Sequence, residues 1–328
     1  MKVCIIGGGS WATAIVKMLT ENKVKINWWM RSRPDIDYIL NFKRNRRYLS
    51  SAIIDLESVQ LFDDIVEAIK HTDIVILAVP SAYILSAISP LTKQHFANRL
   101  VVTAIKGMIP DSGLLITDYI EQHYEVSPEQ LMMIAGPCHA EEVAMERLSY
   151  LTICGNSLEN AEIFARMLRS RFVKVSANGD LDGAEYCAIM KNIISVACGI
   201  AHGLNYGDNF QAVMVSNSIG EINNMLQVVC PKERDLTGSA YLGDLLVTAY
   251  SQFSRNRTLG NMIGRGYSVR SAQMEMSMIA EGYFAAKSIR KIQEKYHIDM
   301  PITTAVYNIL YERISPIIEY QILRDKFH

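Results

Sequence analysis

The sequence has almost no net charge and no long hydrophobic run, and both absences restrict the class of protein. Its 33 Lys and Arg residues are matched by 34 Asp and Glu residues, so the formal net charge is −1. Such a chain has no overall positive field to attract nucleic acid or an anionic membrane. No apolar run reaches about 18 residues, the length of a membrane span, and no basic, apolar leader precedes the first strand. We therefore expect a cytoplasmic protein without a nucleic-acid partner and without stable membrane insertion.

Paired cysteines are absent as well. The sequence has no C-x-x-C pair, and its six cysteines are scattered over the chain at Cys4, Cys138, Cys154, Cys187, Cys198 and Cys230. This spacing in a cytoplasmic chain is typical of reduced thiols in a core, so we expect no metal site. What is present, 49% hydrophobic and 20% charged residues, is ordinary for a globular enzyme, and 328 residues are enough for two domains.

The first eleven residues, MKVCIIGGGSW, organise the rest of the chain. Val3 to Ile6 form an apolar run typical of a buried parallel strand, three glycines follow, and residues 11–19 have the apolar stripe of a helix. Strand, glycine turn and helix begin a dinucleotide-binding unit. Gly7 permits the tight turn, and Gly9 lets the backbone approach a pyrophosphate at the helix N-terminus. Ala12 occupies the third position of the fingerprint, where a small residue is tolerated.

A second strand, expected over Lys25 to Trp29, ends in a turn that selects between NAD and NADP. An acidic side chain in this place binds the ribose hydroxyls of NAD, whereas arginine accommodates the 2′-phosphate of NADP. Here the turn offers Arg31 and Arg33 and no adjacent carboxylate. We assign both arginines to the cofactor and expect NADPH to be favoured over NADH, with both accepted. A solvated basic turn is the alternative, and the basic run 43–47 is expected to be a solvated face.

Further buried strands are expected over residues 74–79, 100–104, 131–134, 151–154 and 172–175, with helices over residues 63–70 and 160–168. Candidate ligand residues follow three of these strands: Pro80-Ser81, Lys106-Gly107, and the segment from Gly136 to Ala140. Open α/β sheets bind ligands at the carboxyl ends of their strands. The fold class is therefore α/β, with an N-terminal Rossmann-like, doubly wound, mainly parallel sheet.

After Gly179 the pattern changes to long helices that continue to the C-terminus. We place a dinucleotide-binding domain over residues 1–179 and an all-helical substrate domain over residues 180–328. The charged tail, residues 320–328, is expected to fray.

Lys191 lies in the middle of a long apolar helix, expected over residues 184–204. A lysine there costs free energy unless it is paired or faces a polar cleft. Cys187, Lys191 and Ser195 share one helical face, so Lys191 can point to a cleft while its neighbours pack. Desolvation lowers the pKa of such a lysine, which suits a group that donates and accepts a proton near neutrality. The alternative is a surface lysine that extends its amine to solvent.

A second polar cluster follows, with Asp244 after a glycine and the triplet Ser254, Arg255 and Asn256 further on. The planar guanidinium of arginine can make two parallel hydrogen bonds to a phosphate. The flanking serine and asparagine add hydrogen-bonding groups suited to a small polyol phosphate.

Seven blocks of the sequence, in the same order, resemble those of the bacterial-type NAD(P)-dependent glycerol-3-phosphate dehydrogenases. The first four are GGGSWATA, AVPS, AIKG and GPCHAEEVA, which are similar to the family's GxGSWGTA, AVPS, TKG and GPSFAxEVA. The last three are KNIISVACGIAHGL, LGDLLVTAYSQFSRNRTLG and AEGYFAA, which are similar to KNVxAIAxGIxxGL, GDLxxTCxSxxSRNxxxG and VEGxxTA. The resemblance spans nearly the whole chain.

The resemblance implies reduction of dihydroxyacetone phosphate to sn-glycerol 3-phosphate, with supply of phospholipid synthesis. Lys191 is then the proton-transferring residue, with help from Lys106 and Asp244. The substrate site comprises Lys106, Gly136, Lys191, Asp244, Ser254, Arg255 and Asn256. With the glycine turn and the two arginines, the cofactor site comprises Gly7, Gly9, Ser10, Trp11, Arg31, Arg33, Lys106, Ala140, Arg255 and Glu281. The expected partner is a small-molecule phosphate, and the expected assembly is a homodimer.

The sequence also departs from the family pattern, beginning with Ala12 in place of the third glycine. Cys138-His139 replaces Ser-Phe, Ser239-Ala240-Tyr241 replaces Leu-Ala-Gly, and Asn217 stands where arginine is frequent. Two alternatives remain open. A β-hydroxyacid dehydrogenase shares the architecture and a catalytic lysine in a KN pair, but binds a carboxylate. A non-catalytic relative that senses NAD(P) does not need Lys191 or Arg255, and both are present.

Overall fold

The computed structural model describes residues 1–110, 112–276 and 278–327. The chain divides into two compact units, Met1–Ile105 with Leu114–Ala184, and Lys106–Gly113 with Glu185–His328. The segment after the fifth strand therefore belongs with the second unit. The division of the chain into domains over residues 1–179 and 180–328 stays a prediction.

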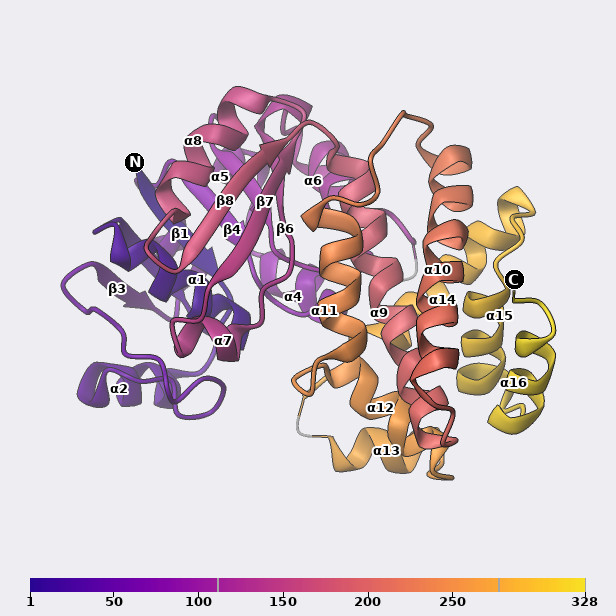
Figure 1. The fold of residues 1–328 in the computed structure, drawn as a ribbon. Helices are drawn as coiled ribbons and strands as arrows, with labels where there is room; N and C mark the ends of the chain where they lie inside the picture. Colours follow the sequence, from indigo (N-terminus) through magenta and orange to yellow (C-terminus); the bar gives the residue numbers. More distant parts are fainter. Residues whose placement is uncertain (111, 277, 328) are drawn as a thin grey trace. The chain divides into compact units, whose positions relative to one another are not determined.

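The first unit contains one eight-stranded sheet in the order β3-β2-β1-β4-β5-β6-β7-β8 (Figure 1). The strands are β1 Lys2–Ile6, β2 Lys25–Trp29, β3 Val59–Phe62, β4 Ile74–Leu77, β5 Leu100–Thr103, β6 Leu131–Ala135, β7 Ser149–Gly155 and β8 Val173–Asn178. All neighbouring strands pair in parallel except β6 and β7. The predicted doubly wound, mainly parallel sheet is confirmed. Strand β3 was not predicted, because it is an edge strand whose short VQLF run is only partly buried.

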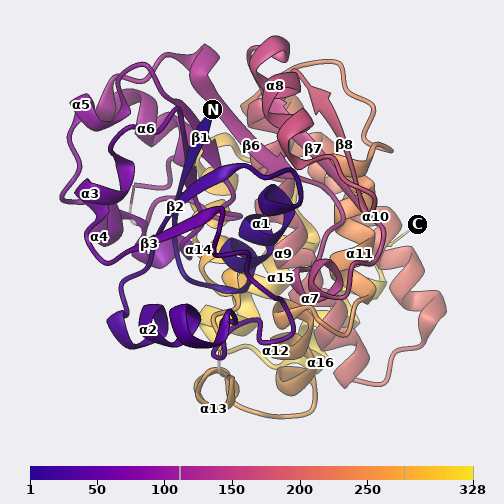
Figure 2. The same cartoon turned by 90° about the vertical axis from the view of Figure 1, so that its left-hand side faces the viewer.

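The helices of the first unit are α1 Ser10–Glu21, α2 Arg33–Phe42, α3 Ile65–Ile69, α4 Ile84–Ile88, α5 Lys93–Phe96, α6 Ile116–Tyr124, α7 Ala140–Ala144 and α8 Leu158–Leu168. Figure 2 shows α3, α4, α5 and α6 on one side of the strands and α1 on the other. Alternate strand side chains, such as Val3, Ile5 and Ile76, share one buried core with residues of α1, α7 and α8. Strands covered on both faces are apolar throughout, which is why their runs could be recognised in the sequence.

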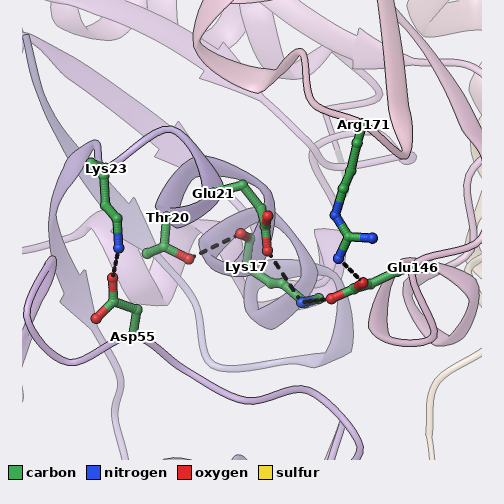
Figure 3. A network of polar contacts seen from close by, with 7 residues as sticks. All are labelled: Lys17, Thr20, Glu21, Lys23, Asp55, Glu146 and Arg171. Carbon is green, nitrogen blue, oxygen red and sulfur yellow. Dashed lines mark hydrogen bonds and ion pairs between the residues drawn. The ribbon is translucent and has the colours of Figure 1, made fainter.

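A cluster of charged side chains connects α1 to two later segments of the first unit (Figure 3). Lys17 of α1 is buried, and its Nζ lies 2.9 Å from Glu146 Oε1 and 3.5 Å from Glu21 Oε1. Arg171 pairs with the other carboxylate oxygen of Glu146. The hydrogen bond from Lys17 is the main cause that holds the pKa of Glu146 below its usual value. Because Glu146 follows α7 directly, these ion pairs hold α7 beside α1.

The helices of the second unit are α9 Leu181–Gly203, which starts at the end of the first unit, α10 Asp208–Val229, α11 Asp244–Tyr250, α12 Arg255–Gly264, α13 Val269–Glu275, α14 Glu281–Tyr296, α15 Pro301–Tyr307 and α16 Pro316–Arg324. Two π-helical turns, η3 Ser239–Gly243 and η4 Asn308–Glu312, precede α11 and follow α15. The predicted all-helical C-terminal region is confirmed.

Four glycines let α9 and α12 cross in backbone contact. A Cβ at Gly199 or Gly203 of α9 would overlap a carbonyl oxygen of α12, and a Cβ at Gly260 or Gly264 of α12 would overlap one of α9. Each helix carries its two glycines four residues apart, which places both on one face. This close crossing sets the position of the start of α12 relative to α9.

The expectation that the tail frays is wrong for residues 320–324, whereas residues 325–327 lie beyond the last helix. Helix α16 continues to Arg324, and Tyr320 is completely buried, with its hydroxyl donating to the Ala197 carbonyl at 2.6 Å. Tyr320 and Leu323 are buried apolar anchors between the charged residues, and burial of such anchors stabilises a terminal helix. His328 lies outside the described residues.

Among the described residues, α9 is the one helix whose length and composition would allow it to cross a membrane. Of its most apolar window of 18 residues, 94% is buried inside the structure. A helix that is apolar on all sides is typical of a protein core, and α9 occupies that place here.

Candidate functional site

The turn between β1 and α1 fits a dinucleotide pyrophosphate. Gly7 has φ +137°, a Cβ there would overlap the Ala78 carbonyl, and its own carbonyl accepts a hydrogen bond from Trp28 Nε1 at 2.6 Å. Gly9 is the N-cap of α1, and a Cβ at this position would meet no atom within 4 Å. The first turn of α1, which starts with Ser10 and Trp11, contains no acidic residue. Open space in front of a helix N-terminus without nearby carboxylates is suited to an anion.

The two arginines after β2 differ in their surroundings. Arg33 begins α2, and its guanidinium lies 3.0 Å from Asp37 Oδ1 and 3.2 Å from Asp63 Oδ2. Arg31 is exposed and forms no ion pair with the described part of the chain. Arg33 is thus paired with two carboxylates, and the assignment of Arg31 and Arg33 to the cofactor stays a prediction.

A third segment, residues 45–48, lies against the glycine turn, although the sequence suggested only a solvated face. Asn45 is 1% exposed, and its Nδ2 donates to the Gly8 carbonyl at 2.9 Å and to Thr13 Oγ1 at 2.8 Å. Ser10 Oγ donates to the Tyr48 carbonyl at 2.9 Å. The local pattern of a basic run gives no signal for these contacts, because they join residues more than thirty positions apart in the sequence.

The turn after β6 contains two further predicted residues, both buried. Gly136 has φ +106°, and a Cβ there would lie 2.7 Å from the Tyr150 carbonyl oxygen. Ala140 is the first residue of α7. A side chain larger than hydrogen at Gly136 would therefore displace the backbone that leads to Ala140.

In the second unit, Lys191 and Lys106 both pair with Asp244. Lys191 Nζ hydrogen-bonds Asp244 Oδ1, and Lys106 Nζ lies 3.3 Å from Asp244 Oδ2. Lys191 is 5% exposed and Asp244 is 1% exposed, while Lys106 is half-buried. Asp244 is the first residue of α11, directly after the π-helical turn η3. The alternative of a solvent-facing Lys191 is therefore wrong.

Burial lowers the pKa of Lys191 from 10.5 to about 7. The carboxylate of Asp244 raises this pKa, and the charge of Lys106 lowers it further. Burial raises the pKa of Asp244, but the two lysines outweigh burial and hold it below its usual value. The expected lowering of the Lys191 pKa by desolvation is confirmed. At neutral pH, a lysine with this pKa can both donate and accept a proton.

Ser254 is joined to α9 and α11 through Ser195. Ser195 Oγ donates to the Thr248 carbonyl at 2.8 Å and lies 2.7 Å from Ser254 Oγ. A hydroxyl has one proton and the carbonyl only accepts, so Ser254 is the donor to Ser195. Ser254 Oγ also accepts from the Arg257 amide at 3.3 Å, which caps α12. Its one proton is thus used within the protein.

A chain of amide groups joins four segments of the second unit. Asn192 Nδ2 donates to the Lys106 carbonyl at 2.9 Å, Asn256 Nδ2 donates to Asn192 Oδ1 at 2.8 Å, and the Gly282 amide donates to Asn256 Oδ1 at 2.9 Å. Asn192 was not predicted as a site residue. A polar amide beside Lys191 in an apolar helix was the signal that could have identified it, because a buried amide requires a hydrogen-bond partner. These hydrogen bonds hold the segment that contains Lys106 beside Lys191 on α9.

Two more predicted residues begin helices of the second unit. Arg255 starts α12 and is exposed, and its Nη1 lies 3.8 Å from Met278 Sδ. Glu281 starts α14 and is half-buried. Among the described residues, no group of three or more His, Cys, Asp and Glu side chains could hold a metal ion.

The structure thus forms two sets of predicted residues, one in each unit. The first unit places the glycine turn and Ser10 against residues 45–48, and it gives Arg33 but not Arg31 an ion pair among the described residues. The second unit joins Lys106, Lys191 and Asp244, with Ser254 and Asn256 bonded to the same helix. The second set is an ion-paired cluster in which a buried carboxylate lies between two lysines.

Residues 2–161 match the family described as NAD-dependent glycerol-3-phosphate dehydrogenase N-terminus, and residues 180–320 match its C-terminus. Glycerol-3-phosphate dehydrogenase [NAD(P)+] of an Exiguobacterium species is 35% identical over 321 residues, which cover 96% of this chain and 92% of the relative. The enzyme of the same name from Syntrophomonas wolfei is 33% identical over 311 residues, covering 94% and 90%. The crystal structure of glycerol-3-phosphate dehydrogenase from Coxiella burnetii has a TM-score of 0.93 at 27% identity and covers 99% of each chain.

Proposed function

This chain belongs to the NAD-dependent glycerol-3-phosphate dehydrogenase family and is an oxidoreductase that uses NADH or NADPH, and we propose that Lys191 transfers the proton when it interconverts dihydroxyacetone phosphate and sn-glycerol 3-phosphate. The observation that supports this role most strongly is the buried contact between Lys191 and Asp244. A buried lysine with a lowered pKa beside a specific charged partner marks a functional site.

In the reduction, the bound nicotinamide cofactor supplies the hydride. Lys191 Nζ gives its proton to the oxygen of the substrate carbonyl as that oxygen becomes an alkoxide. Asp244 stays ionised and orients the amine, and the positive charge of Lys106 stabilises the negative charge on the same oxygen. In the oxidation, the neutral amine of Lys191 accepts the proton of the substrate hydroxyl.

Arg255 binds the phosphate of the substrate in this proposal. It is exposed and its guanidinium has no carboxylate partner among the described residues, which supports a role for its donors outside the protein. Asn256 retains one amide proton for the phosphate, because Nδ2 has two and the structure uses one. Ser254 holds this segment against α9, and Gly136 contributes backbone to the substrate site.

The cofactor ligands of the proposal are the glycine turn with Gly7 and Gly9, Ser10, Trp11, Arg31, Lys106, Ala140, Arg255 and Glu281. The absence of a carboxylate next to Arg31 supports a preference for NADPH over NADH, because an acidic residue there would repel a 2′-phosphate. Solvent around the exposed Arg31 weakens its contact, so both cofactors are accepted.

In the cell, we place the protein in the cytoplasm as a homodimer that supplies glycerol phosphate for phospholipid synthesis. It acts on a small molecule and needs neither a nucleic-acid partner nor stable insertion into a membrane. The family match favours this reading over a β-hydroxyacid dehydrogenase and over a non-catalytic NAD(P) sensor.

The test is Lys191→Met, which keeps much of the side-chain volume and removes the proton donor. We expect kcat for dihydroxyacetone phosphate reduction to fall about 10²- to 10⁴-fold, the usual range for general acid catalysis. The Kd for NADPH, from isothermal titration calorimetry, is expected to change by less than about twofold, because the loss is confined to the transition state. A variant that retains a tenth of the wild-type kcat would show that another group transfers the proton. A wild-type enzyme that reduces β-keto acids but not dihydroxyacetone phosphate would support the β-hydroxyacid alternative.

A further inference from the structure

The segment 45–48 contains two arginines, Arg46 and Arg47, and its backbone lies beside the glycine turn. Asn45 and Tyr48, on either side of them, hydrogen-bond to the Gly8 carbonyl and to Ser10. Met30, the residue before Arg31, also borders this turn, because a Cβ at Gly8 would lie 2.8 Å from its Cε. The chain around Arg31 and the chain around Arg46 and Arg47 therefore meet at the same turn, from distant parts of the sequence.

The side chains of these two arginines lie in different places. The guanidinium of Arg46 lies 4.8 Å from the centre of the Tyr38 ring, in the middle of α2. The guanidinium of Arg47 lies 5.3 Å from the centre of the Tyr48 ring, and its Nη1 is 4.0 Å from Asp35 Oδ2. Asp35 is in the first turn of α2, which begins two residues after Arg31. Arg47 is thus at the helix end that Arg31 precedes, whereas Arg46 is not.

The same surroundings leave Arg31 and Arg47 with donors for a ligand. Arg33 is neutralised by Asp37 and Asp63. Arg31 has no ion pair with the described part of the chain, and the side chain of Arg47 is 65% exposed, with Asp35 too distant for a hydrogen bond. The Tyr48 ring beside the guanidinium and the buried Asn45 two residues earlier restrict Arg47 before any ligand binds, which reduces the entropy lost on binding.

We propose that Arg31 and Arg47 together bind the 2′-phosphate of NADPH, and that Arg47 is a cofactor-specificity residue. The proposal rests on the proposed function, since it assumes that NADPH occupies the glycine turn. Two guanidinium groups can make charge-assisted hydrogen bonds to the several oxygens of one phosphate. NADH has a neutral hydroxyl at this position and gains little from a second cation. The Asp35 carboxylate, whose side chain is 10% exposed and lies 4.0 Å from Arg47, repels a phosphate at this place, so binding requires both cations to outweigh it.

The experiment measures binding of NADPH, NADH and adenosine 2′,5′-bisphosphate to the full-length protein by isothermal titration calorimetry. Arg47→Gln is compared with Arg46→Gln, a matched control one residue away whose guanidinium lies over Tyr38. We expect Arg47→Gln to weaken NADPH and the bisphosphate about tenfold or more and to leave NADH within about twofold. Arg46→Gln is expected to leave all three within about twofold. Arg47→Lys, which keeps the charge and loses the planar fork, should fall between wild type and Arg47→Gln.

Two results would overturn the role of Arg47. One is an Arg47→Gln variant with unchanged NADPH affinity, and the other is an equal loss of NADPH and NADH affinity. A wild-type protein that binds NADH as tightly as NADPH would overturn the preference itself, and with it the arginine pair. If the preference for NADPH persists in Arg47→Gln, Arg47 is excluded as a specificity residue and the proposed function is unaffected. The two failures are therefore distinguishable.

Discussion

At the scale of single residues, Lys106 affects the electrostatics of Lys191. Lys106 and Lys191 share the Asp244 carboxylate, and the charge of Lys106 lowers the pKa of Lys191. A buried lysine is unfavourable in its charged form, and a second cation nearby adds to this cost. Lys106 therefore adjusts the pH at which Lys191 can give up its proton, in addition to any contact with substrate.

This gives a pH prediction with a definite sign. In the proposed mechanism reduction requires protonated Lys191, so kcat/KM for reduction should decrease as the pH rises through about 7, and kcat/KM for oxidation should increase over the same range. In Lys106→Met the pKa of Lys191 rises, so the decrease in reduction moves to higher pH even if the absolute rate falls. The measurement is kcat/KM for the substrate against pH in both directions at saturating cofactor. An alkaline limit that stays in place, or moves to lower pH, would show that Lys106 does not set this pKa.

At the scale of elements, the crossing of α9 and α12 positions the predicted phosphate ligands. Asn256 and Ser254 reach their partners on α9, Asn192 and Ser195, over 2.8 Å and 2.7 Å. Such distances require the two helix backbones to touch, and glycine is the residue that permits this approach. The glycines of this crossing are thus part of the site although none of them carries a functional side chain.

We predict that Gly260→Ala disturbs both stability and catalysis. Its Cβ would overlap the Val196 carbonyl, so the helices must separate, and overpacking of this kind costs about 1–3 kcal/mol or more of unfolding free energy. Gly220→Ala in α10 is the control, because its Cβ meets no atom within 4 Å, and it should stabilise the protein by about 0.5–1 kcal/mol. Urea unfolding gives the free energies, and KM for dihydroxyacetone phosphate reports the displaced ligands. Equal effects of the two substitutions would contradict a role for the crossing.

At the scale of the whole molecule, the two sets of predicted residues lie in different units. The first unit has the glycine turn that fits a pyrophosphate, and the second has the buried lysine and carboxylate. Within the first unit, the ion pairs of Glu146 with Lys17 and Arg171 join the segment after α7 to the helix of the glycine turn (Figure 3).

We expect the cofactor to stabilise the folded chain by mass action. A ligand at 100 times its Kd adds about 2.7 kcal/mol to the free energy of unfolding, which raises Tm by several degrees. At equal concentration NADPH should raise Tm more than NADH, because of its tighter binding. Thermal unfolding followed by circular dichroism, with each cofactor and with AMP as the control, measures this order. A larger Tm with NADH than with NADPH would contradict the predicted preference.

The sequence by itself determined those features that depend on residues close together in the chain. The strand, glycine turn and helix at the N-terminus, the buried parallel strands and the apolar helix around Lys191 all have local patterns, because burial on every side leaves a continuous apolar run. The order of seven motifs was enough to predict the family.

Contacts between residues that are distant in the sequence, by contrast, depend on the tertiary structure. The neutralisation of Arg33, the contact of Asn45 with the glycine turn and the buried position of Tyr320 depend on partners 30, 37 and 123 residues away. A local pattern carries no information about such a partner. The same basic run or charged tail is solvated in a fold that places no hydrogen-bond partner beside it. The edge strand β3 was missed for the same reason, since its four residues form a strand by pairing with β2.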